Sequence, residues 1–189
     1  MRLESTPING LFVLHKPVHQ DSRGQFTRLF AAEGIAAAGR PTHAVHVNTS
    51  TSEEAGTLRG IHFQYAPYAE AKIVACTAGA IWDVGVDLRP QSPTRFQWFG
   101  IKLTPSNGLS MVIPEGFGHA FITLEPHSTA IYVVSAVYAP KYESGICYDD
   151  PTVAIDWPSA PTVLSAKDLA WGPVKSRVDE LDAGFSSLL

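Results

Sequence analysis

Five residues of this chain have types and spacing that suggest chemistry: Arg59, His62, Lys72, His119 and Tyr132. A neutral imidazole can accept a proton near pH 7, and a lysine or arginine cation can stabilise the oxygen of an enolate. A tyrosine phenol can return a proton to carbon. Together these side chains favour proton abstraction beside a carbonyl group, followed by proton return on the opposite face.

The surroundings of His119 resemble the second half-motif of the cupin superfamily. The run GLSMVIPEGFGHAF, which starts at Gly108, places Pro114, Gly116 and His119 in the spacing G-x5-P-x-G-x2-H. A strand, a tight Pro-Glu-Gly turn and a second strand would direct His119 into a barrel, where a buried polar group needs a partner. A histidine that is merely satisfied within the core remains the alternative.

The first cupin half-motif is incomplete. The run GTLRGIH, from Gly56 to His62, keeps its opening spacing, but Gln64 replaces the second histidine, and Lys72 follows the nearby acid Glu70 by two residues. Divalent metals need three or four His, Cys or carboxylate ligands. We therefore expect no metal and no other cofactor, and a metal-dependent cupin oxygenase or isomerase is a minor alternative.

Strand alternation creates a difficulty for Arg59 and His62. Residues three apart in a regular strand point to opposite faces, so these two could not share a cavity. A bulge at Gly60 would re-aim one of them. Without such a bulge, Arg59 would lie on a solvated face of the sheet.

The sequence pattern is typical of an all-β protein. Short runs rich in β-branched and aromatic residues, separated by Gly or Pro, predict strands near 11–18, 24–30, 42–51, 57–64, 71–88 (bent near Gly79), 96–103, 109–113, 119–125 and 128–138. Short helices are expected over 31–38 and 176–183. We predict a cupin double-stranded β-helix (a jelly-roll barrel) forming one domain over 1–189, with an irregular C-terminal tail from Pro151.

Size, charge and cysteine content limit the possible partners and location. The 189 residues carry a net charge of -4, which gives no basic field for nucleic acid. No apolar run is long enough to span a membrane, and the N-terminus has no basic leader followed by a long apolar stretch. Cys76 and Cys147 are far apart in the sequence and are expected to remain reduced. These features favour a cytoplasmic protein.

From about Gly10 to Pro173 the sequence resembles the dTDP-4-dehydrorhamnose 3,5-epimerase family. The similarity rests on ordered motifs: DSRGQFTRLF (21–30), NTSTS (48–52), LRGIHFQ (58–64), KIV (72–74), WDVGVDLRPQSPT (82–94), IPEGFGHAF (113–121), YAP (138–140), DDP (149–151) and LSAKD (164–168). Their order is more specific than any single motif. The resemblance implies epimerisation at C3, C5 or both of a nucleotide-diphospho-4-keto-6-deoxy sugar, of the type dTDP-4-dehydro-6-deoxy-D-glucose to dTDP-4-dehydro-L-rhamnose.

The same resemblance implies catalytic roles. His62 would be the general base, Asp168 its partner in a dyad, Tyr132 the proton donor and Lys72 the cation beside the keto oxygen. From sequence alone, Asp168 is equally a surface acid and Tyr132 an ordinary strand tyrosine. The substrate-binding residues implied are Arg23, Phe26, Arg28, Asn48, Arg59, Gln64, His119 and Tyr138.

The segment around Arg23 and Phe26 matches one that reaches the nucleotide, in family members often from the partner subunit. Together with exposed strand edges, this leads us to expect a homodimer. For Phe26, a plain apolar strand position is the alternative to stacking on the nucleobase.

Departures from the family pattern leave the substrate open. Arg28 stands where family members commonly have an acid, so the nucleobase could be thymine, cytosine or guanine. Val137 and Tyr148 also alter the pocket wall. Two other functions remain as alternatives: a non-catalytic cupin that binds a sugar nucleotide, and a 3,4-ketoisomerase acting on the same substrate class.

Overall fold

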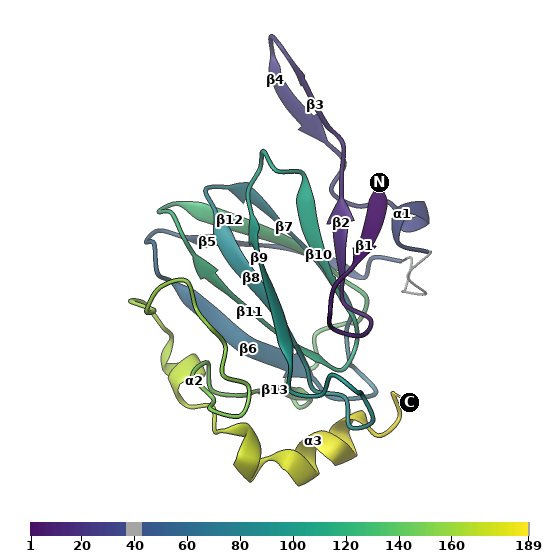
Figure 1. The fold of residues 1–189 in the computed structure, drawn as a ribbon, viewed down its shortest axis with the longest axis vertical. Helices are drawn as coiled ribbons and strands as arrows, with labels where there is room; N and C mark the ends of the chain where they lie inside the picture. Colours follow the sequence, from purple (N-terminus) through teal and green to yellow (C-terminus); the bar gives the residue numbers. More distant parts are fainter. Residues whose placement is uncertain (37–42, 189) are drawn as a thin grey trace.

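The computed structural model describes residues 1–36 and 43–188, which form two antiparallel β-sheets packed face to face (Figure 1). In spatial order, the larger sheet contains β1 (Arg2–Ser5), β2 (Phe12–His15), β10 (Leu109–Ile113), β7 (Lys72–Ala78), β12 (Ser128–Val134) and β5 (His46–Ser52). The smaller sheet contains β13 (Glu143–Gly145), β6 (Leu58–Gln64), β11 (Phe117–Thr123), β8 (Ile81–Asp87) and β9 (Trp98–Leu103). A separate hairpin, β3 (Val18–Asp21) with β4 (Gly24–Thr27), projects from the body. The predicted jelly-roll architecture is confirmed.

From β5 onward, successive strands alternate between the two sheets except at the β8–β9 hairpin, and this alternation closes the barrel. The predicted bend near Gly79 is such a crossing: β7 ends in the larger sheet, and β8 begins in the smaller one. Gly79 has a φ of 64°, and a Cβ there would lie 2.3 Å from the Ser128 hydroxyl. Glycine adopts this left-handed conformation without strain, and it alone leaves that space open.

Apolar residues on the facing sides of the sheets fill the barrel interior, while the C-terminal tail covers the outer face of the smaller sheet. The tail includes α2 (Ala166–Leu169), the 3-10 turn η1 (Val174–Ser176) and α3 (Val178–Phe185). Helix α3 buries Leu181 and Phe185 against Phe63 of β6. The tail therefore forms a second hydrophobic cluster with the outer face of the smaller sheet.

Some elements differ from the prediction. Strands β1 and β13 and helix α2 were not predicted, because each is only three or four residues long. Within the run 11–18 only β2 and the first residue of β3 are strand, and the rest of β3 was not predicted. The strand predicted over 128–138 ends at Val134. Helix α1 (Ala32–Ala36) lies within the predicted 31–38, whose last two residues, like residue 42 of the strand predicted over 42–51, are outside the described residues.

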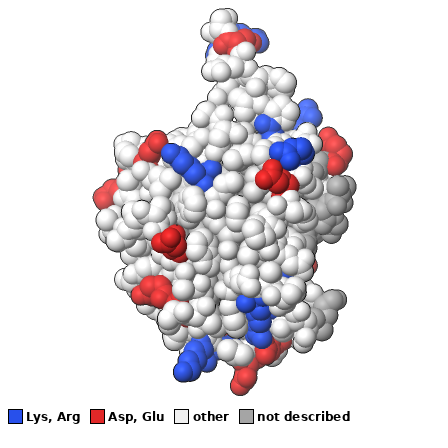
Figure 2. All heavy atoms as spheres, in the orientation of Figure 1, with Lys and Arg blue, Asp and Glu red and all other residues white. Residues whose placement is uncertain are grey.

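The surface is sparsely charged. On the face seen in Figure 2, the described acidic and basic side chains are interspersed and form no basic patch. None of the helices in the described part of the chain is long and apolar enough to span a bilayer. Cys76 and Cys147 are free thiols.

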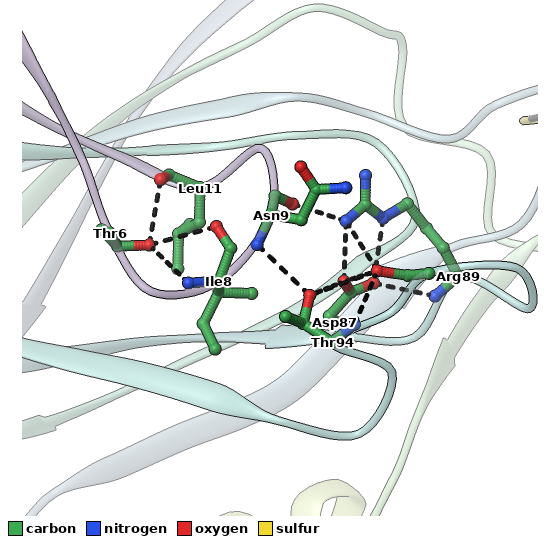
Figure 3. Close-up of polar contacts among 8 residues, drawn as sticks. Thr6, Ile8, Asn9, Leu11, Asp87, Arg89 and Thr94 are labelled. Carbon is green, nitrogen blue, oxygen red and sulfur yellow. Dashed lines mark hydrogen bonds and ion pairs between the residues drawn. The ribbon is translucent and has the colours of Figure 1, made fainter.

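A fully buried aspartate anchors the turn that follows β8 (Figure 3). Asp87 accepts hydrogen bonds from the Arg89 guanidinium at 2.7 and 2.9 Å and from the hydroxyls of Ser92 and Thr94. Arg89 also donates to the Asn9 carbonyl, and the Asn9 N–H donates to Thr94. The DLRPQSPT motif therefore ties the N-terminal loop to the barrel.

We expect Asp87→Asn to cost about 1 to 3 kcal/mol of stability, because charge-assisted hydrogen bonds are lost from a buried site. Burial alone would raise the pKa of Asp87, but the hydrogen bonds from Arg89, Ser92 and Thr94 outweigh it and hold the pKa below its ordinary value. A carboxylate with a depressed folded-state pKa stabilises the protein above its unfolded pKa of about 4, and this contribution disappears as the pH falls through the folded pKa.

Urea unfolding between pH 7 and 3 checks this prediction. The free energy of unfolding should fall less steeply below pH 4 in Asp87→Asn than in the wild type. Parallel pH profiles for the two proteins would contradict the assignment.

Candidate active site

Two adjoining cavities open between the sheets, with volumes of about 460 and 720 Å³. His62, Lys72 and Tyr132 line both of them. The first cavity is also bordered by Arg59 and His119. The residues predicted to perform the chemistry thus all border the first cavity, whose volume is typical of small-molecule sites.

His62 forms a dyad with Asp168. The distance from His62 Nε2 to Asp168 Oδ1 is 2.5 Å, and the Asp168 side chain is only 5% exposed. Burial alone would raise the pKa of Asp168, but the hydrogen bond and charge of His62, with smaller contributions from Ser165 and the Gly60 N–H, hold the pKa below its ordinary value. Because Asp168 occupies Nε2, Nδ1 is the ring nitrogen left to accept a proton.

Helix α2 places Asp168 at this point. Ser165 precedes the helix as its N-cap, and its hydroxyl accepts a hydrogen bond from the Asp168 N–H at 3.0 Å. This cap defines where the short helix begins and directs the aspartate inward. Asp168 is therefore not a surface acid, which was the alternative that the sequence left open.

The expected bulge lies at Gly60. Between β6 and β11, His62 pairs with His119 and Arg59 pairs with Phe121, so Gly60 and Ile61 oppose the single residue Ala120. The extra residue turns both Arg59 and His62 into the cavity, as predicted. Gly60 has a φ of 130°, and a Cβ there would lie 2.4 Å from that of Ala120.

His119 faces His62 directly across the strand pair and also has a carboxylate partner. Its Nε2 lies 2.8 Å from Oδ1 of Asp83 on β8, and both side chains are buried. His119 is thus a satisfied core histidine that also lines the cavity. Sequence reasoning missed Asp83, although an acid within the apolar run IWDVGV should have indicated a buried partner.

Lys72 and Tyr132 lie on the wall opposite His62, because β7 and β12 belong to the larger sheet. The Lys72 ammonium lies 3.1 Å from the Glu70 carboxylate. Burial and the charge of Glu70 raise the pKa of the Tyr132 phenol above its ordinary value, although Arg59 opposes this. The phenol therefore stays protonated at neutral pH and can donate its proton.

The other predicted binding residues near the cavities differ in how many of their polar groups are already hydrogen-bonded within the protein. Arg59 makes only long hydrogen bonds of 3.4 Å, to Ser52 and Thr51, and Asn48 lines the larger cavity. Gln64 also borders that cavity, but its amide donates to two backbone carbonyls and accepts from the Ala139 N–H at 2.6 Å. Gln64 therefore orders the rim, and a contact with substrate stays a prediction.

A polar network that the sequence did not predict crosses the rim. Glu143 on β13 accepts hydrogen bonds from the Tyr138 hydroxyl at 2.7 Å and from the Lys167 ammonium at 2.5 Å. Burial would raise the pKa of Glu143, but these two partners outweigh it and keep the pKa below its ordinary value. The network links the loop before β13 to the helix that carries Asp168.

Three predicted binding residues lie away from both cavities in this chain. Arg23 and Phe26 belong to the projecting hairpin, and Arg28 follows it. Arg23 is paired with Asp21 at 2.6 Å, and Phe26 is 64% exposed. Within one subunit these residues therefore do not join the site.

Metal-binding side chains do not gather among the described residues of the site. Nowhere in residues 1–36 and 43–188 do three His, Cys, Asp or Glu side chains gather closely enough to hold one. His62 and His119 already have carboxylate partners. Metal independence stays a prediction, which elemental analysis of the purified protein tests.

Comparisons with known proteins point to one family. Residues 5–176 match the family model described as dTDP-4-dehydrorhamnose 3,5-epimerase. The enzyme of that name from Mycobacterium tuberculosis is 38% identical, over 90% of this chain and 86% of its own. A dTDP-4-dehydrorhamnose 3-epimerase from Streptomyces niveus is also 38% identical, over 89% of this chain and 81% of its own.

A solved structure is similarly close. The dTDP-6-deoxy-D-glucose-3,5-epimerase of Legionella pneumophila, in complex with dTDP-4-keto-L-rhamnose, superposes with a TM-score of 0.89. It is 35% identical, and the match covers 95% of this chain and 96% of that one. The jelly-roll barrel, the histidine-lined cavity and these relatives together define an isomerase of the cupin fold that acts on carbohydrates. The chain belongs to the dTDP-4-dehydrorhamnose 3,5-epimerase family.

Proposed function

We propose that this protein inverts carbons beside the ketone of a nucleotide-diphospho-4-keto-6-deoxy sugar. The observation that carries the proposal is the placement of His62 and Tyr132 on opposite walls of one cavity, with Lys72 on the same wall as Tyr132. Epimerisation needs a base on one face of the sugar and an acid on the other. A binding-only cupin would not require this arrangement.

The reaction proceeds in two proton transfers. Nδ1 of His62 removes the proton from the carbon beside the ketone, and the C–H electrons form the enolate, whose oxygen the Lys72 ammonium stabilises. Asp168 stabilises the imidazolium that results. The Tyr132 hydroxyl then protonates the carbon from the opposite face, and solvent restores the proton on Tyr132 and removes the one on His62.

Deuterium exchange tests this function. With dTDP-4-keto-6-deoxyglucose in D₂O, NMR should show deuterium entering C3, C5 or both, and the pattern distinguishes single from double inversion. The test is then repeated with cytidine and guanosine analogues, because Arg28 leaves the nucleobase open. Binding of any of these sugars without exchange would favour the non-catalytic alternative.

Tyr132→Phe should separate proton removal from inversion. The variant should still exchange the substrate proton, because His62 is unchanged, but the formation of inverted product should fall about 10²-fold when the acid is lost. In the wild type, the raised pKa of Tyr132 should place the alkaline limb of activity above about pH 10. Equal loss of exchange and inversion would contradict the assigned role.

We also propose that the protein is a homodimer in which the hairpin of one subunit reaches the cavity of the other. The hairpin projects from the body and carries the exposed Phe26, and the edge strand β5 and its approach expose Val45 and Val47 beside the larger cavity. In this arrangement Arg23 and Arg28 would supply cations to the nucleotide. A monomer in light scattering would contradict it.

We make two further proposals, one about domain organisation and one about location. We propose that residues 1–189 act as one domain, because the tail buries Leu181 and Phe185 against the barrel. We place the protein in the cytoplasm, whose reducing conditions fit the two free thiols.

A further inference from the structure

The indole ring of Trp171 packs beside the His62 ring. The centroids of the His62 and Trp171 rings are 6.5 Å apart, with an angle of 69° between the ring planes. Trp171 borders neither cavity, so it contacts the imidazole from the side away from the substrate space. Trp171 lies three residues beyond Asp168, so one short segment supplies both neighbours of the base.

Gly145 in β13 has no side chain and so leaves space for the indole. Gly145 pairs with His62 across β13 and β6, and a Cβ on Gly145 would lie 2.6 Å from Cε2 and Nε1 of Trp171. A side chain at this position would push the indole away from its place. The indole N–H is buried and has no hydrogen-bond partner among the described residues, so ring packing rather than a polar contact determines where Trp171 lies.

Arg177 holds the indole from its other side. Its guanidinium carbon lies 5.7 Å from the centre of the Trp171 ring, within the range of a cation–π contact. The same guanidinium donates to the Gly145 carbonyl and to the Ser144 hydroxyl, and it is paired with Glu180 at 2.8 Å. Arg177 therefore links the indole, the strand residue opposite His62, and helix α3.

We propose that Trp171 is a positioning residue for His62, a role that rests on the proposed function of His62 as the base. The hydrogen bond to Asp168 fixes one nitrogen of the imidazole, but the ring can still turn about that contact. The indole edge blocks this rotation, so that Nδ1 stays aimed at the substrate carbon. Because proton transfer depends on this alignment, a loosened ring lowers the rate of chemistry and leaves substrate binding intact.

Kinetics of tryptophan variants test the proposal. Trp171→Ala should lower kcat about tenfold to 10²-fold and leave KM within about twofold of the wild type. Trp171→Phe, which retains an aromatic ring, should recover most of kcat. Trp157→Ala is the matched control, because Trp157 lies on the same tail, donates to the Tyr148 carbonyl and borders neither cavity. It should keep the wild-type kcat.

A second measurement needs no substrate, so it remains informative if the proposed function is wrong. The ¹⁵N shifts of the His62 ring in the wild type should report mainly one tautomer, with its proton on Nε2 facing Asp168. In Trp171→Ala the tautomer should persist, because Asp168 is unchanged, but the ring resonances should broaden as the imidazole moves between orientations. Trp157→Ala should resemble the wild type. The proposal is overturned if Trp171→Ala retains both kcat and sharp His62 ring resonances, or loses only as much activity as Trp157→Ala.

Discussion

His62→Asn should lower kcat by about 10² to 10⁴, the contribution usual for a positioned general base. Asparagine retains a hydrogen-bonding group near Asp168 but cannot accept a proton at neutral pH. KM should change little, because the cations and the other polar groups of the cavity remain. Rates of solvent exchange at C3 and C5 provide the measurement, since they follow proton removal directly.

The control uses the same substitution at an exposed histidine. His127 lies in the turn before β12, has a φ of 53°, and its side chain pairs with Glu53 at the surface. Asparagine tolerates this left-handed conformation, so His127→Asn should fold normally and retain full activity. Undiminished turnover by His62→Asn would exclude His62 as the base.

Gly60→Ala should destabilise the protein by about 4 kcal/mol and also disable the site, because two costs add at this position. The φ of 130° is costly for any residue with a Cβ, by about 1 to 3 kcal/mol. The new methyl would also lie 2.7 Å from the Ala120 Cα and 2.8 Å from the His119 carbonyl oxygen, and relieving such overlap costs about 1 to 3 kcal/mol more. Moving the strands apart would misalign His62, because it lies two residues after the bulge.

Gly24→Ala separates the cost of the backbone conformation from the cost of the steric overlap. Gly24 has a φ of 126°, close to that of Gly60, but a Cβ added there would meet nothing within 4 Å. Urea unfolding should therefore show the smaller, backbone cost alone at Gly24. Equal losses of stability in the two variants would show that the close approach to Ala120 is unimportant.

The sequence was sufficient to predict the barrel and the position of His62 within it. Periodic apolar runs locate most strands. Strand alternation would separate Arg59 from His62, and Gly60 was identified as the place where a bulge could bring them together, which is where the bulge lies. These features are local in the chain, so composition and spacing reveal them.

The partners of the two histidines could not be predicted from local pattern. Asp168 is separated from His62 by 106 residues and lies on a four-residue helix with no periodicity, so only the family resemblance identified it. The acid within IWDVGV indicates that Asp83 is buried with a partner, but strand pairing decides that this partner is His119. The path of the tail likewise decides what Trp171 touches. Contacts between distant segments leave no signal in any one of those segments.

The distance along the chain between His62 and Asp168 has a consequence for how the protein folds. Contacts between residues far apart in sequence close large loops, and such contacts generally slow folding. Strands β6, β11 and β8 can pair before the tail docks, whereas the dyad exists only after it has docked. During refolding from urea, circular dichroism should therefore recover ahead of enzymatic activity, and the interval between them measures the docking of residues 165–185.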